Sequence, residues 1–161
     1  MTKKINFDDS YEHFKTIISQ QEDRIKKIKT ASDWIDFEKK TPIVIGVCFG
    51  DGIGELICKQ TLTILNVLLK DELINGKIQI KTIEGLTIEN RVKHNQSIPT
   101  DVLAEIKRCD VLLKGPTTTP QRGGPWPNIE SANVSMRREL DLFANIRPVK
   151  VPAKNIEWYF F

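Results

Sequence analysis

Residues 114–150 read KGPTTTPQRGGPWPNIESANVSMRRELDLFANIRPVK and combine a loop, a predicted helix and a predicted strand. The apolar run Val111–Leu113 before them is typical of a buried strand. Ser131 stands where a helix N-cap is expected, ahead of residues that form helices well. The short apolar segment Leu142–Ile146 is a candidate strand that returns beside the first. The pattern therefore favours a strand, a loop rich in glycine and proline, a helix and a second strand.

Polar and cationic side chains of this stretch form a candidate anion site. On a helix that begins at Ser131, Asn133 and Arg137 are four residues apart and share one face. Guanidinium groups bind carboxylates through paired hydrogen bonds, a hydroxyl and an amide orient them, and a helix N-terminus adds free N–H groups. The alternative is that the arginines pair with Glu139, Asp141 or another carboxylate of the chain itself. The candidate set is Ser131, Asn133, Arg137 and Arg147, with Lys114 nearby.

At these residues the chain resembles the isocitrate/isopropylmalate dehydrogenase family of metal-dependent decarboxylating dehydrogenases. The resemblance runs from about Ile43 to Phe161 and is greater to the isocitrate branch. The segment Ser131–Asn133, followed by Arg137 and Arg147, matches the substrate motif of that branch. Isopropylmalate enzymes carry bulkier residues with apolar contacts at the serine and asparagine positions. The resemblance implies a partial dehydrogenase-like α/β fold.

The resemblance also implies an activity, namely the NAD(P)-dependent oxidative decarboxylation of isocitrate to 2-oxoglutarate in the tricarboxylic acid cycle. The implied cofactors are NAD or NADP, together with Mg²⁺ or Mn²⁺. Arg137 and Arg147 would bind substrate carboxylates, and Ser131 and Asn133 would orient the substrate. The threonines Thr118 and Thr119 would lie near the nicotinamide end of the dinucleotide.

The family's remaining machinery follows the segment that this chain resembles. It comprises a third substrate arginine, a catalytic tyrosine and lysine, metal-binding aspartates and most of the nucleotide site, none of which is assigned here. We therefore expect the 161-residue chain to be inactive alone and to form a homo-oligomer or associate with a missing C-terminal half. The alternative is a non-catalytic regulatory or structural subunit that keeps an anion pocket and associates with a partner chain. An arginine-containing continuation of the reading frame after Phe161 would favour the first interpretation, and a native stop the second.

The bulk composition is that of an ordinary globular protein. Its 24 basic and 21 acidic residues are interleaved and give a net charge of +3, whereas a nucleic-acid-binding protein typically concentrates basic residues on one face. Three cysteines at positions 48, 58 and 109 follow neither a metal-binding nor an even disulfide pattern. The sequence contains no signal-peptide pattern and no membrane-spanning apolar run. The expected compartment is the cytoplasm, with no nucleic-acid or membrane partner.

Residues 1–41 are predicted to be an N-terminal helical extension. Asp8, Asp9 and Ser10 are good capping residues, and an apolar stripe with helical spacing follows them. This stripe consists of Phe14, Ile17, Ile18, Gln21, Ile25 and Ile28. It could dock on the chain's own domain, pair with another helix or lie on a membrane surface, although its polar face carries both signs of charge.

Residues 42–161 are predicted to be the N-terminal part of a dehydrogenase-like domain. Its strands and helices should alternate, with strands at 43–49, 77–83 and 111–113 and helices at 56–69, 87–94 and from Pro99 onward. That order predicts an α/β fold with a parallel or mixed sheet and flanking helices, and ligands at the carboxyl ends of its strands. Outside the candidate site, Arg138 is expected to be solvated.

The turn Gly50–Gly54, between a strand and a helix, has an alternative interpretation as a dinucleotide-binding loop. The dinucleotide fingerprint requires a third small residue where Glu55 stands, and a carboxylate there would face the pyrophosphate. A tight strand-to-helix turn is therefore the favoured interpretation.

Overall fold

The computed structural model describes residues 7–30, 35–121, 123–142 and 144–160, and it divides into two compact units. The first unit comprises residues 1–39 and the second residues 40–161. Each unit is described by itself below. The assignment of residues 1–41 and 42–161 to a helical extension and a partial dehydrogenase domain stays a prediction at this point.

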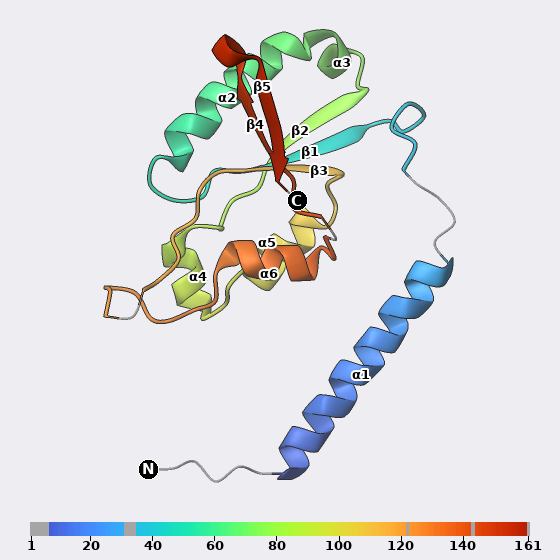
Figure 1. The fold of residues 1–161 in the computed structure, drawn as a ribbon, viewed down its shortest axis with the longest axis vertical. Coiled ribbons are helices and arrows are strands. Elements are labelled where there is room, and N and C mark those ends of the chain that lie inside the picture. The colour runs from blue at the N-terminus through green and yellow to red at the C-terminus, as the bar shows by residue number, and fades with distance from the viewer. Residues whose placement is uncertain (1–6, 31–34, 122, 143, 161) are drawn as a thin grey trace. The chain divides into compact units, whose positions relative to one another are not determined.

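The first unit contains one long helix, α1 (Phe7–Thr30) (Figure 1). Its first turn carries Asp8 and Asp9 and its last turn Lys27 and Lys29, which suits the helix dipole at both ends. The helix begins at Phe7, slightly earlier than the capping residues indicated, and none of its residues is buried. Among the described helices, none is both long and apolar enough to cross a membrane.

The second unit is built on a three-stranded parallel sheet, as predicted. Its strands are β1 (Ile43–Cys48), β2 (Ile78–Thr82) and β3 (Val111–Lys114), in the order β2-β1-β3. β1 lies in the centre, so β2 and β3 are the edges. The apolar runs that predicted the strands coincide with the three strands of this sheet to within one residue at each end.

Helices connect the strands and flank the sheet. Between β1 and β2 lie α2 (Gly54–Leu68) and α3 (Lys70–Ile74), and between β2 and β3 lie α4 (Ile88–His94) and α5 (Thr100–Ile106). Figure 1 shows α2 and α3 on one side of the sheet and α5 and α6 (Ala132–Glu139) on the other. This arrangement confirms the α/β class.

The core lies between the sheet and the pair α5–α6. One buried hydrophobic cluster there includes Cys48 of β1, Val102 and Ile106 of α5, and Ala132 and Met136 of α6. All five side chains are buried. By contrast, several apolar side chains of α2 are exposed: Leu56, Ile57, Ile64, Val67 and Leu68.

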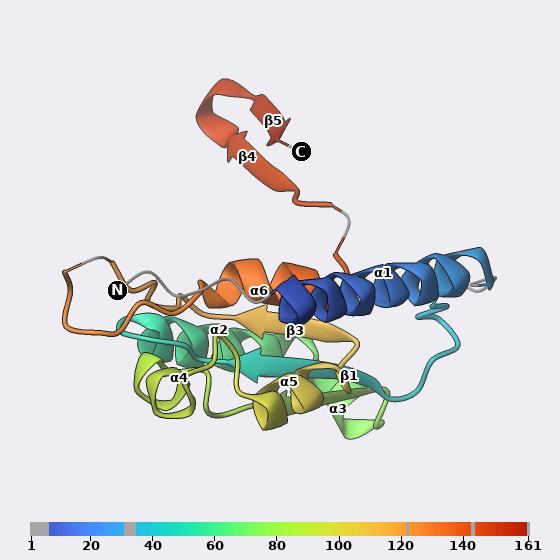
Figure 2. The same ribbon diagram turned by 90° about the horizontal axis from the view of Figure 1, so that it is seen from below.

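The chain after α6 differs from the prediction. A strand was expected at Leu142–Ile146, of which Phe143 lies outside the described residues; the other four residues form no strand. Instead, β4 (Arg147–Val151) begins later and pairs antiparallel with β5 (Ile156–Phe160), not with β3. The physical reason is local closure, because the short turn η1 (Pro152–Lys154) and the left-handed Asn155 join two strands that are neighbours in sequence. The hairpin is drawn in red in Figure 2.

The start of α5 also differs by one residue. Pro99 was predicted at the first helical position, but it occupies the N-cap position with φ −56° and ψ 142°, and the helix begins at Thr100. That conformation is extended, and proline adopts it readily because its ring fixes φ near this value.

Two glycines permit the close packing of the turn after β1, and one of them meets the segment that follows β3. Gly50 has a φ of +75°, and a Cβ built there would lie 2.0 Å from the carbonyl oxygen of Pro116. In the same turn, the backbone N–H of Asp51 donates to that oxygen at 2.7 Å. Gly54 is equally restricted, because its Cβ would lie 2.2 Å from the oxygen of Phe49. The favoured interpretation of this segment as a tight turn is therefore the one that the structure supports.

We predict that Gly50→Ala destabilises the chain far more than Gly76→Ala. Both glycines have positive φ, +75° and +70°, but a Cβ at Gly76 meets nothing within 4 Å. The left-handed conformation alone costs about 1–2 kcal/mol, and the collision at Gly50 should add at least about 2 kcal/mol. Urea unfolding of both variants measures the difference. Equal midpoints would show that the close approach of the two segments is unimportant.

Candidate functional site

The carboxyl end of β3 carries Lys114, the first residue of the predicted site. Its Nζ donates to the carbonyl of Gly115 at 2.6 Å and to the hydroxyl of Thr117 at 3.1 Å. Burial lowers the pKa of Lys114, while the nearby groups of Cys48 and Asp51 oppose that change. The side chain also lines a hollow of about 600 Å³ between β3, α5 and α6. Lys114 is thus anchored in the structure, and its ammonium orients the start of the threonine loop.

Asp51 holds the threonine loop from the turn after β1. Its carboxylate accepts one hydrogen bond from the backbone N–H of Ile88 at 2.7 Å and another from that of Thr118 at 2.6 Å. Hydrogen bonds to a charged carboxylate are stronger than those between neutral groups. Asp51 therefore fixes both the start of α4 and the loop that follows β3.

Arg91 holds the same loop from the other side. Its side chain is fully buried at 0% exposure, and it donates to the backbone carbonyls of Ser97 (2.7 Å), Thr118 (2.8 Å) and Glu130 (3.1 Å). Burial lowers the pKa of Arg91, and the charge of Asp51 opposes that change. The planar guanidinium joins three segments that are distant in sequence, which a single ammonium cannot do.

Helix α6 begins where predicted, with Ser131 at its N-cap position. The side chain of Ser131 makes no capping hydrogen bond, and its hydroxyl lies 3.4 Å from that of Thr119. The Ser131 backbone carbonyl accepts from the N–H groups of Val134 and Ser135, both at 3.1 Å. Because the serine is not used as a side-chain cap, its hydroxyl is available to a ligand.

The Glu130 side chain links the N-terminal end of α6 to the last turn of the same helix. Its carboxylate accepts from the hydroxyl of Ser135 at 2.5 Å and from two nitrogens of Arg138 at 3.0 Å each. These bonds, above all those from Arg138, lower the pKa of Glu130. Arg138 is exposed, in line with the expectation that it is solvated. In addition, its guanidinium forms a bidentate pair with Glu130, the residue directly before the N-cap of α6.

Asn133 and Arg137 lie on the exposed side of α6, while Ala132, Ser135 and Met136 are buried. Glu139, one of the carboxylates considered as a partner for Arg137, pairs instead with Arg138 at 3.7 Å and with Lys107 at 3.8 Å. The amide and the guanidinium are thus both accessible from solvent.

Arg147 is the first residue of β4 and lies opposite Phe160 in the hairpin. β4 pairs with β5 and not with the parallel sheet. Direct contacts therefore join Ser131 to Thr119 and Lys114 to Thr117, whereas the association of Arg147 with Arg137 stays a prediction.

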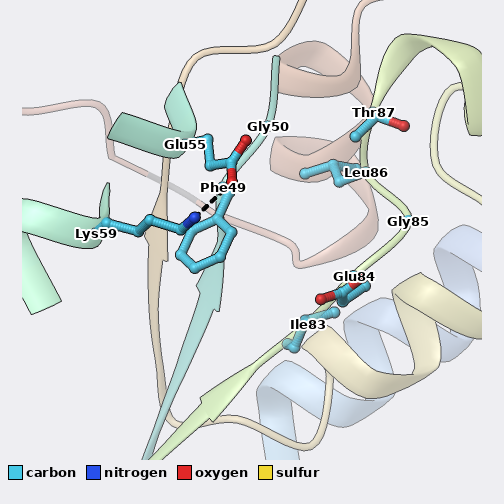
Figure 3. A pocket seen from close by; sticks show the side chains of 9 residues that line it. All are labelled: Phe49, Gly50, Glu55, Lys59, Ile83, Glu84, Gly85, Leu86 and Thr87. Carbon is cyan, nitrogen blue, oxygen red and sulfur yellow. Dashed lines mark hydrogen bonds and ion pairs between the residues drawn. The ribbon is translucent and has the colours of Figure 1, made fainter. Parts of the chain in front are cut away.

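A separate hollow lies at the carboxyl ends of β1 and β2 (Figure 3). It has a volume of about 400 Å³ and is lined by Phe49, Gly50, Glu55, Lys59 and residues 83–87. Glu55 and Lys59 form an exposed ion pair of 2.6 Å at its rim, which lowers the pKa of Glu55. The backbone N–H groups of Asp51 and Gly54 are used by carbonyls of the fold. A carboxylate at the rim and occupied N–H groups both disfavour a phosphate-binding loop here.

The side chains of the candidate site suit an anion and not a metal ion. Lysine, arginine, asparagine, serine and threonine supply cationic and neutral hydrogen-bond donors. Across the residues that the structure describes, no three histidine, cysteine, aspartate or glutamate side chains are grouped as metal ligands. A divalent cation therefore finds no ligand set in the described part of the chain.

Sequence reasoning missed Asp51 and Arg91, although they hold the threonine loop of the candidate site. Asp51 had been considered only as part of a glycine turn. Arg91 follows Ile88 by three residues, so the two lie on the same, buried side of α4. An arginine on the apolar face of a short helix is the signal that could have revealed it, because such a group is buried only when its donors are paired.

The fold and this arrangement define the second unit as an α/β domain of the kind that binds ligands at the carboxyl ends of parallel strands. A family model described as isocitrate/isopropylmalate dehydrogenase matches residues 44–158. The chain belongs to the isocitrate/isopropylmalate dehydrogenase family. This finding confirms the resemblance drawn from residues 114–150.

Individual relatives agree with the family. The isocitrate dehydrogenase (NADP) of Rickettsia bellii is 44% identical over 109 residues, which cover 67% of this chain and 20% of that protein. The isocitrate dehydrogenase (NADP) of Staphylococcus epidermidis is 32% identical over 126 residues (78% and 28%). The homoisocitrate dehydrogenase of Methanocaldococcus jannaschii is 30% identical over 100 residues (62% and 26%). The chain thus matches 20–28% of the length of these relatives.

We predict that Arg91→Met lowers the free energy of unfolding by at least about 3 kcal/mol, because it leaves three carbonyls without their donor and Asp51 without its nearby positive charge. Arg91→Lys should recover little of this loss, since one ammonium cannot reach all three carbonyls. Arg108→Met, on an exposed arginine, should change stability by no more than about 0.5 kcal/mol. Urea unfolding monitored by circular dichroism compares the three variants. A small effect of Arg91→Met would refute the central role of this side chain.

Proposed function

We propose that this chain supplies the carboxylate-binding segment of an NADP-dependent, decarboxylating isocitrate dehydrogenase. The observation that carries the proposal is the start of α6, where the hydroxyl of Ser131 is not used as a cap and meets that of Thr119 at 3.4 Å. Asn133 and Arg137 are exposed on the same helix. A hydroxyl, an amide and a guanidinium are therefore available together, and relatives named isocitrate dehydrogenase (NADP) support this substrate.

Each side chain has a distinct role in the proposal. Arg137 binds one substrate carboxylate through its planar fork, and Arg147 binds another. Ser131 and Asn133 orient the substrate through neutral hydrogen bonds, and the N-terminus of α6 adds partial positive charge. Lys114 acts indirectly, because it holds Thr117 and with it the beginning of the threonine loop.

The proposed cofactor site adjoins the substrate site at Thr118 and Thr119. Asp51 binds the N–H of Thr118 and Arg91 binds its carbonyl, so this residue is held at both ends of its backbone. A rigid threonine pair with hydroxyl groups suits the amide of a nicotinamide ring. The dinucleotide, when bound, accepts the hydride from the substrate alcohol. We assign no step to a metal ion, since the described side chains offer it no ligand set.

Substrate selectivity tests the proposal. A site that hydrogen-bonds a substrate group discriminates against an analogue that lacks it, because its own polar groups are then left unpaired. We predict that Asn133→Leu weakens the binding of isocitrate by about tenfold or more and that of isopropylmalate much less. Arg137→Lys should weaken both, since it removes the bidentate fork, and Ser131→Asp should repel the isocitrate trianion.

Titrations of the chain with both compounds, monitored by nuclear magnetic resonance, compare the variants. Asn128→Leu is the matched control, because Asn128 is an exposed asparagine in the loop before α6. An unchanged ratio of isocitrate to isopropylmalate affinity in Asn133→Leu would remove the support for isocitrate and leave only a general anion site.

We also expect no isocitrate turnover by the 161-residue chain on its own. The proposed roles cover binding and orientation, and no described residue is proposed as the proton-transfer group or as a metal ligand. The measurement is NADH or NADPH formation with isocitrate and either Mg²⁺ or Mn²⁺, against a metal-free blank. Turnover above that blank would show that catalytic groups of this chain had been overlooked.

A further inference from the structure

Helix α1 has a more regular apolar pattern than an ordinary amphipathic helix. Because it begins at Phe7, two aromatic residues, Phe7 and Tyr11, extend the stripe toward the N-terminus. The positions then recur at alternating intervals of four and three residues over the whole helix: Phe7, Tyr11, Phe14, Ile18, Gln21, Ile25 and Ile28. The six apolar side chains of this set are 43–81% exposed. Among the described residues of the helical unit, therefore, none covers the stripe.

This spacing is that of a coiled coil. An average of 3.5 residues between apolar positions keeps one straight contact line along a pair of supercoiled helices, whereas the 3.6-residue period of a single helix drifts away from it. The helix has 24 residues, which is more than three heptads. Apart from Ile17, every residue outside the stripe is polar or charged. An isolated helix of this kind is marginal in water and is stabilised by burying its apolar face.

We propose that α1 pairs with α1 of a second copy of this chain in an antiparallel, two-stranded coiled coil. The charges beside the stripe favour this partner and direction. Every second position of the stripe, beginning with Phe7, is followed directly by a charged residue. These residues alternate in sign along the helix: Asp8, Lys15, Glu22 and Lys29. When Ile18 lies opposite the partner's Gln21, Lys15 lies beside the partner's Glu22, and Asp8 beside the partner's Lys29. Two-fold symmetry repeats both pairs, so four oppositely charged pairs flank the contact line.

Other pairings of the same two helices are less favourable. In a parallel pair, Arg24 faces the partner's Lys29, which repels it, and Lys15 faces the partner's Ser10. In an antiparallel pair shifted by one heptad, Lys15 faces the partner's Lys15 and Asp8 faces the partner's Glu22. Among these three arrangements, only the proposed register places each of Asp8, Lys15, Glu22 and Lys29 beside a charge of opposite sign.

The polar residue in the stripe is compatible with the same register. The two copies of Gln21 lie three residues apart along the axis, or about 4.5 Å, so their side-chain amides can hydrogen-bond to each other. A buried polar residue of this kind commonly specifies the register of a coiled coil at some cost in stability. Gln21 thus restricts how the two helices can slide.

The first test measures the mass of the full-length chain by sedimentation equilibrium over a range of micromolar concentrations. Ile18→Glu should weaken self-association by at least about tenfold, because it places a carboxylate in the contact line. Ser19→Glu, the matched control on the polar side, should leave it unchanged. If the wild type is monomeric, or if Ile18→Glu associates as the wild type does, self-pairing through α1 is wrong. A monomer would leave the chain's own second unit as the cover of the stripe.

The second test concerns direction. Lys15→Glu should weaken association because it faces the partner's Glu22, and the double change Lys15→Glu with Glu22→Lys should restore it by exchanging the charges. A parallel pair would respond to neither change, since positions 15 and 22 then face Ser10 and Ile17 of the partner. Failure of the double variant to recover would overturn the antiparallel arrangement even if self-association through α1 held.

Discussion

The contact between one buried guanidinium and three backbone carbonyls determines how the second unit is assembled. The segment between β3 and α6 is irregular, so its buried peptide groups cannot satisfy one another as those of a helix or strand do. Arg91 supplies donors to the carbonyls of Ser97, Thr118 and Glu130, and Asp51 supplies acceptors to the N–H groups of Ile88 and Thr118. Thr118 is thus held by an anion and a cation at once, which fixes the loop without a metal or a disulfide in the described residues.

The same network distinguishes Arg138, which is paired within the protein, from Arg137, which is exposed to solvent. Arg138 is committed to Glu130, and the carbonyl of Glu130 in turn accepts from Arg91, so the front of α6 is attached to the core. Its neighbour Arg137 is on the exposed side of the helix. Two adjacent arginines therefore differ in their surroundings: Arg138 supports the helix through Glu130, and Arg137 is the exposed one that our proposal pairs with a substrate carboxylate.

The elements that could be predicted from sequence are those with a local cause. The apolar run of β1, the cap position of Ser131 and the spacing of α1 each depend on neighbouring residues, and the structure confirms these elements. Arg91 could not be assigned because its partners are carbonyls, which every residue carries and no sequence pattern distinguishes. The strand expected at Leu142–Ile146 could not be assigned for a related reason: strand pairing depends on residues outside the segment, and the strand that forms is β4, which pairs with β5.

Within the described residues, three exposed apolar faces stand out, and they differ in how well they define a partner. The register of the hairpin places Val149, Trp158, Val151 and Ile156 on one face, and α2 exposes Leu56, Ile64 and Leu68. Neither face has a repeating pattern of charges at its border, whereas α1 has one with alternating signs. A specific pairing through α1 would hold two copies of the second unit at an effective concentration that can reach the millimolar range. Contacts through the hairpin and α2 could then be weak and still be occupied. The α1 face would therefore determine how the copies assemble, and the other two faces would only need to bury their apolar side chains.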